Sequence, residues 1–170
     1  MGAQIAAHLS NAGIDTVLFD LPAAEGNPNA IALKALDNLK KLKPAPLMSA
    51  GRVDGITPAN YGTDLALLAD CDLVIEAIAE RLDWKADLYA KIAPHLAPHA
   101  ILASNTSGLS IEKLAASVPT EVQSRFCGIH FFNPPRYMYL VELIATKGCQ
   151  GDTLDALEIF LTLRLGKGVV

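Results

Sequence analysis

The sequence predicts an α/β fold built around a doubly wound, mostly parallel sheet. Short runs of β-branched and apolar residues alternate along the chain with segments whose apolar residues recur at helical spacing. Several of these runs lack polar alternation, which is typical of strands buried on both faces. Hydrophobic residues make up 51% of the 170 residues and charged residues 19%, a composition that supports one core and excludes a disordered chain. The length favours a single domain.

The first elements are a helix, a strand and a second helix. Residues 4–11 have helical spacing, which Gly13 ends. Residues 16–20 are a β-branched and aromatic run and predict a strand. Residues 30–42 carry apolar side chains on one face and lysines on the other, so we predict an amphipathic helix.

The rest of the chain continues the alternation. Residues 43–60 are rich in proline and glycine and predict a long loop with at most a weak strand at 53–57. Apolar runs predict strands at residues 73–75, 101–103, 126–132 and 140–145, and another strand begins at 169–170. Helical spacing predicts helices at residues 65–69, 82–96, 111–117 and 152–165. Ser110 is a candidate N-cap for one of them, and Gly166 closes the last.

Charge and composition exclude some functions. The chain carries 14 Lys+Arg and 18 Asp+Glu, a formal net charge of −4, whereas a surface that follows nucleic-acid phosphates needs a basic excess. No segment reaches the ~20 apolar residues of a membrane-spanning helix, and no signal peptide is recognisable. Cys71, Cys127 and Cys149 lack metal-ligand spacing, so we expect reduced, buried thiols, no metal and a cytoplasmic location.

The N-terminal residues contain part of a phosphate-binding motif. The sequence opens directly into a helix, with Gly2 where the last glycine of a G-x-G-x-x-G turn would lie. Asp20, 18 residues later, ends the first predicted strand, where an acid binds the ribose 2′-hydroxyl of a dinucleotide. A carboxylate there repels a 2′-phosphate, so NAD is favoured over NADP. An ordinary glycine at a helix start is the alternative explanation of Gly2.

Three further motifs are more specific in combination. They are LVIEAIAE at residues 73–80, ASNTS at 103–107 and GIHFFNPP at 128–135. In this order and spacing they resemble the NAD-binding domain of 3-hydroxyacyl-CoA dehydrogenases, most closely that of large bacterial multidomain members with an enoyl-CoA hydratase-like part. The resemblance covers residues 1–170. It implies a Rossmann-like domain that lacks the family's first strand and is incomplete at the N-terminus, with the family's helical C-terminal domain absent.

The resemblance assigns catalytic roles to His130, Glu142 and Ser107. Oxidation of a 3-hydroxyl group needs a base for its proton, and histidine suits that task near neutral pH. Glu142 lies in an apolar predicted strand, where an unpaired carboxylate is costly, and a hydrogen bond to His130 would remove that cost and orient the imidazole. We expect the two side chains within ~2.6–3.2 Å of each other, beside Ser107 and Asn133. A structural histidine, an edge-strand glutamate and a capping hydroxyl are the alternatives.

The resemblance also implies cofactor and substrate contacts. The residues it places at the cofactor, in addition to Gly2 and Asp20, are Ala77, Glu80, Lys85, Ser107 and Asn133. Glu80 and Lys85 are alternatively plain helix-surface charges, and Asn133 an Asx turn before a proline. The substrate contacts it implies are Ser107 and the lysines Lys40 and Lys43, which would meet the phosphates of coenzyme A. A solvated helical face is the alternative for the lysines. His8, His95 and His99 correspond to no family residue and are expected at the surface.

The implied function is NAD-dependent oxidation of (S)-3-hydroxyacyl-CoA to 3-oxoacyl-CoA in fatty acid β-oxidation. The implied partner is an acyl-CoA substrate, and a homo-oligomer is compatible with it. Two alternatives stay open: a truncated, non-catalytic Rossmann module with weak nucleotide binding or a partner-binding role, and a dehydrogenase for another 3-hydroxy acid. Because the family's first strand would lie between the strands ending at Asp20 and Ile75, we expect little dehydrogenase activity from this chain alone.

Overall fold

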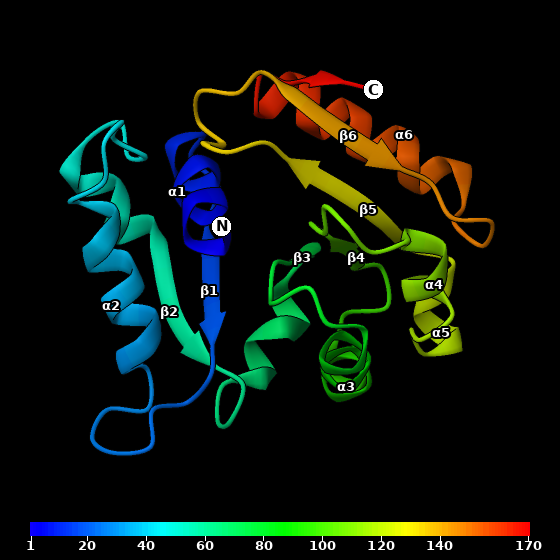
Figure 1. Ribbon diagram of the computed structural model, residues 1–170, viewed down its shortest axis with the longest axis horizontal. Helices are drawn as coiled ribbons and strands as arrows, with labels where there is room; N and C mark the ends of the chain where they lie inside the picture. Colours follow the sequence, from blue (N-terminus) through cyan, green and yellow to red (C-terminus); the bar gives the residue numbers. More distant parts are fainter. The chain divides into compact units, whose positions relative to one another are not determined.

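The computed structural model describes all 170 residues, which form two units. Unit 1 contains Met1–Leu67 and Asn133–Tyr139, and unit 2 contains Leu68–Phe132 and Leu140–Val170. Each unit combines parallel strands with helices, as the sequence predicts (Figure 1). None of the helices has both the length and the apolar character needed to cross a lipid bilayer.

Unit 1 contains a two-stranded parallel sheet with two helices. β1 (Thr16–Asp20) pairs with β2 (Ile56–Asn60). α1 (Gly2–Asn11) precedes β1, and α2 (Ala30–Leu39) lies in the connection between the strands (Figure 1). Apolar side chains from both helices, the following loop and β2 form its core: Ala6, Ala7, Leu36, Leu39, Leu47 and Ile56.

A glycine turn joins α1 to β1. Gly13 has a φ of +75°, in the left-handed region that favours glycine. Its amide donates to the Ser10 carbonyl at 2.9 Å, and the Ile14 amide donates to the Leu9 carbonyl at 3.2 Å. These two bonds are those of a Schellman motif. The helix therefore ends where the sequence predicts.

The prediction of a long loop at residues 43–60 was wrong. This segment contains a 3-10 helix at Ala50–Gly55 and the complete strand β2, not a weak strand at 53–57. Pro58 concealed the strand, because proline has no amide to donate to a sheet. β2 accommodates it because β2 has only β1 as a neighbour.

The predicted end of α2 also needs correction. The helix ends at Leu39, so Lys40 and Lys43 follow it instead of lying on its polar face. Lys40 occupies the C-cap position, where a positive charge is favourable for the helix dipole.

Unit 2 is built on a five-stranded sheet in the order β3-β4-β5-β6-β7. The first three strands are parallel, β6 is antiparallel to β5, and β7 is parallel to β6. The four longer strands begin at the predicted residues. The bounds are β3 (Leu73–Glu76), β4 (Ile101–Ser104), β5 (Phe126–Phe131), β6 (Leu140–Ile144) and β7 (Gly168–Val169).

Helical segments precede β3 and connect the strands that follow it. They are the 3-10 turns Leu65–Asp70 and Ala93–His95, α3 (Leu82–Ile92), α4 (Ile111–Ala115), α5 (Thr120–Gln123), α6 (Gly151–Ile159) and the π-helical turn Phe160–Arg164. The Ser110 hydroxyl caps α4 as predicted, accepting from the Lys113 amide at 3.3 Å. α5 was not predicted, because so short a helix shows no helical period. Gly166, with a φ of +65°, follows the π-helical turn.

Candidate active site

The register between β5 and β6 brings His130 and Glu142 together. The two residues are direct partners in this antiparallel pair, and directly opposite residues project their side chains from the same face of a sheet. His130 Nδ1 lies 2.7 Å from Glu142 Oε2. The predicted hydrogen bond is therefore present.

This geometry selects between the two neutral tautomers of the imidazole. A carboxylate that accepts at Nδ1 favours the tautomer with the proton on Nδ1 over the one with the proton on Nε2, and the Nδ1–H tautomer leaves the Nε2 lone pair available. The His130 side chain is 18% exposed and that of Glu142 43% exposed, so the ring is largely shielded while the carboxylate reaches solvent. The Phe132 ring contacts the imidazole at a centroid distance of 4.6 Å.

Ser107 is held by Glu80. The Glu80 carboxylate accepts hydrogen bonds from the Thr106 hydroxyl, from the Ser107 amide at 2.9 Å and, weakly, from the Ser107 hydroxyl at 3.4 Å. Partial burial would raise the pKa of Glu80, but these hydrogen bonds and the charge of Lys85 together lower it below its ordinary value. Ser107 is exposed and its hydrogen bonds go to Glu80 rather than to His130.

Lys85 is not a surface charge. It is fully buried, and its Nζ lies 2.5 Å from Glu76 Oε1, so the helix-surface alternative was wrong for this residue. Glu76 Oε1 also accepts from the Ile78 amide at 2.7 Å. The ion pair therefore shapes the loop that follows β3 and carries the half-buried Ala77.

The rest of this network was not predicted from the sequence. Glu76 Oε2 accepts hydrogen bonds from the Tyr89 hydroxyl at 2.9 Å and from the Ser104 hydroxyl at 2.7 Å. Burial raises the pKa of the Tyr89 phenol, so it remains a donor. The sequence does indicate such a network. Glu76 ends an apolar strand, and like Glu142 its carboxylate needs a hydrogen-bonding or charged partner there.

Unit 1 carries Asp20 and Gly2. Asp20 ends β1 and is half-buried, with Oδ1 accepting from the Leu21 amide at 2.8 Å. α1 begins at Gly2 with no side-chain cap and no acidic residue in its first turn. A helix start that lacks a cap suits an anionic phosphate, and a strand-end carboxylate suits a ribose diol. These residues fit a dinucleotide.

The remaining predicted residues of unit 1 are exposed. Lys40 Nζ lies 3.1 Å from Asp37 Oδ1, and Lys43 is exposed in the following loop. Asn133 is exposed and begins a segment anchored by Arg136, whose Nη1 donates to the carbonyls of residues 45 and 47 at 2.7 and 2.9 Å. These positions leave the lysines accessible to a ligand.

One histidine and two cysteines differ from expectation. His8 is buried, at 9% exposure, rather than at the surface, whereas His95 and His99 are exposed. All three cysteines are free thiols, but only Cys127 is buried, and burial raises its pKa to about 12. Cys71 and Cys149 are half-buried.

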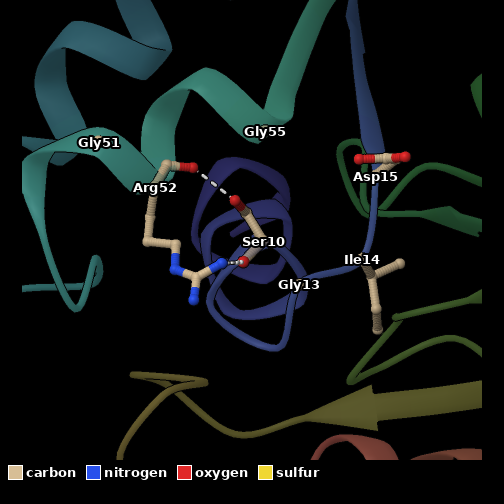
Figure 2. A pocket seen from close by; sticks show the side chains of 7 residues that line it. All are labelled: Ser10, Gly13, Ile14, Asp15, Gly51, Arg52 and Gly55. Carbon is tan, nitrogen blue, oxygen red and sulfur yellow. Dashed lines mark hydrogen bonds between the residues drawn. The ribbon is translucent and has the colours of Figure 1, made fainter.

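A pocket of about 180 Å³ lies at the C-terminal end of α1, and none of the predicted site residues lines it (Figure 2). The Ser10 hydroxyl donates to the Arg52 carbonyl, and Arg52 Nη1 donates to the Ser10 carbonyl at 3.4 Å. The volume is below the ~300 Å³ of a small-ligand site. We therefore do not assign the cofactor to this pocket.

Parallel strands with acidic and hydroxyl side chains at their carboxyl ends define a Rossmann-type dinucleotide-binding domain. The chain belongs to the family of the NAD-binding domain of 3-hydroxyacyl-CoA dehydrogenase, whose model matches residues 1–170. The cofactor of this family is NAD.

Known relatives agree with this assignment. The chain is 46% identical over 171 residues to a fatty acid oxidation complex trifunctional enzyme from Rickettsia felis, covering 100% of this chain and 24% of that protein. It is 35% identical to a 3-hydroxybutyryl-CoA dehydrogenase from Bradyrhizobium diazoefficiens, covering 99% and 56%. The crystal structure of an Escherichia coli 3-hydroxybutyryl-CoA dehydrogenase superposes with a TM-score of 0.81 at 32% identity, covering 100% and 35%. The chain thus spans about a quarter to about half of these relatives.

Proposed function

We propose that this chain supplies the cofactor-binding residues and the general base for NAD-dependent oxidation of (S)-3-hydroxyacyl-CoA to 3-oxoacyl-CoA. The hydrogen bond from His130 Nδ1 to Glu142 carries the proposal, because it leaves Nε2 to accept a proton. Fatty acid β-oxidation is the proposed setting, supported by the name of the Rickettsia felis relative.

The proposed mechanism assigns the proton to His130. Nε2 removes the proton of the substrate 3-hydroxyl group, and the Glu142 carboxylate stabilises the imidazolium that forms. Ser107, whose backbone amide is held by the Glu80 carboxylate, donates a hydrogen bond to the substrate oxygen. NAD, when bound, supplies the hydride acceptor.

The other residues bind and orient. Asp20 accepts hydrogen bonds from the adenosine ribose, and the start of α1 at Gly2 faces the phosphates. The resemblance also assigns Ala77, Glu80 and Asn133 to the cofactor, and the buried Lys85 would support it indirectly by fixing the loop after β3. Lys40 and Lys43 contact the phosphates of coenzyme A.

Turnover of acetoacetyl-CoA with NADH tests the proposal, measured on this chain and on a version extended at both ends. His130→Gln should lower kcat by about 10²–10⁴-fold, the usual contribution of a general base. His95→Gln, which changes an exposed histidine, is the matched control. Full activity of His130→Gln in the extended version would refute the role of His130.

A further inference from the structure

We propose that Asn105 is a positioning residue for His130, an inference that rests on the proposed role of His130 as the base. β4 ends at Ser104, opposite Gly128 of β5. β5 continues to Phe131 beyond the last residue of β4. Asn105 Oδ1 accepts a hydrogen bond from the Phe131 amide at 2.8 Å, so its side chain takes the place of a strand partner there.

Asn105 is itself fixed at the strand ends. Its backbone amide donates to the Glu76 carbonyl at the end of β3, at 2.8 Å. Glu76 is buried and held by its ion pair with Lys85. One half-buried residue thus connects the carboxyl ends of β3, β4 and β5, and this end of the sheet carries His130.

The end of β5 has two supports. On one side, His130 pairs with Glu142 and the buried Phe131 pairs with Val141 of β6. On the other side, the hydrogen bond from the Phe131 amide to Asn105 Oδ1 is the contact that follows the last β4 pair. Without it the Phe131 amide loses its acceptor, and beyond the last β4 pair at Gly128 the end of β5 keeps strand partners on the β6 side only. The 2.7 Å bond to Glu142 depends on the orientation of the His130 backbone.

Three variants of the 170-residue chain separate positioning from general destabilisation. Asn105→Ala removes the acceptor, and Asn105→Asp keeps an oxygen facing the Phe131 amide. Gln123→Ala removes a comparable side-chain bond, from Gln123 Nε2 to the Val118 carbonyl at 2.9 Å, elsewhere in unit 2. Nitrogen NMR shifts of the His130 ring report its tautomer, and hydrogen exchange reports protection of the Phe131 amide.

In the parent chain we expect the Nδ1–H tautomer of His130 and a protected Phe131 amide. Asn105→Ala should speed exchange of that amide by about tenfold and lower the fraction of the Nδ1–H tautomer, and Asn105→Asp should restore both. Gln123→Ala should change neither. An unchanged tautomer in folded Asn105→Ala overturns the proposal. If Asn105→Ala does not fold, the parent chain and Asn105→Asp decide. An unprotected Phe131 amide in the parent chain overturns the proposal. A protected Phe131 amide together with a folded Asn105→Asp variant supports the proposal.

These readouts do not require turnover. If His130→Gln keeps full turnover, the proposed function fails, while the tautomer result still decides whether Asn105 orients the ring. If His130→Gln abolishes turnover and Asn105→Ala leaves the tautomer unchanged, only the role of Asn105 is refuted.

Discussion

The Glu76 carboxylate accepts four hydrogen bonds inside unit 2, from one amide, one lysine and two hydroxyl groups. Lys85 brings the only charge among these donors, and both side chains of the ion pair are 1% exposed. Removing one partner of such a pair leaves the other as an uncompensated buried charge. The pair therefore constrains which substitutions unit 2 tolerates.

Lys85→Met should lower the free energy of unfolding by about 3–5 kcal/mol, because the Glu76 charge loses its partner in the core. The double variant Glu76→Gln/Lys85→Met should recover most of that loss. Urea denaturation followed by circular dichroism measures both.

Arg81→Met provides the control for the buried pair. Arg81 Nη2 lies 2.5 Å from Asp83 Oδ2, but the side chains are 56% and 59% exposed, so Arg81→Met should lower the free energy of unfolding far less than Lys85→Met does. Equal decreases in the free energy of unfolding for Lys85→Met and Arg81→Met would contradict the structural role assigned to Lys85.

The Glu80 carboxylate should stabilise the folded chain at neutral pH and lose this contribution in acid. Its pKa is lowered in the folded state, so its contribution is present above the unfolded pKa of about 4.3 and is lost as the pH falls through the folded value. Glu80→Gln should lower the free energy of unfolding at pH 7. Below about pH 4 the difference in this free energy between variant and parent should become smaller. Denaturation at both pH values checks this, with the exposed Glu121→Gln as control. A gap that widens in acid would contradict it.

At the scale of elements, Gly13 ends α1 with a positive φ and has no atom within 4 Å of the place where a Cβ would lie. Gly13→Ala should therefore cost about 1–2 kcal/mol through backbone strain alone. Gly51→Ala has the same open space without a positive φ and should be close to neutral. Chemical denaturation compares the two, and equal stability of both variants would show that the turn adapts.

The elements that could be predicted are those whose apolar pattern is local. β1 and β3 to β6 begin where the sequence indicates, because each is a continuous run of residues suited to a strand. β2 could not be seen because Pro58 argues against a strand unless the strand is known to lie at an edge. The edge position is a property of the sheet, not of the segment.

The site was predictable to the same extent. The resemblance singled out His130 and Glu142, the cost of an apolar-strand carboxylate supported their pairing, and the register supplied the contact. Lys85 and Asn105 could not be placed, because the sequence does not show that a helix lysine faces the core or that an amide continues a neighbouring strand. Both depend on contacts between strands and helices that are separated along the chain.

At the scale of the whole molecule, β1 and β3 each have a strand neighbour on one side only. The amide and carbonyl groups of their other edges have no strand partner. The chain spans about a quarter to about half of its relatives, so we propose that a version extended at both ends has higher dehydrogenase activity than the 170 residues alone, because added residues can supply backbone amide groups for the phosphates.

NAD affinity and acetoacetyl-CoA turnover of the two versions test this expectation. The tautomer of His130 should be the same in both, since unit 2 contains the whole His130–Glu142 contact. Equal turnover would show that the 170 residues suffice for catalysis.

The antiparallel register of β5 and β6 also determines which insertions and deletions preserve the contact between His130 and Glu142. Glu142 meets His130 because the two strands are aligned, whatever the number of residues in the connection between them. Codons gained in that connection leave the pair intact. A register shift of one residue between β5 and β6 turns the carboxylate to the opposite face of the sheet. Length changes in the connection therefore act on Asn133 and on the segment that Arg136 anchors, whereas a shift of register acts on His130 and Glu142.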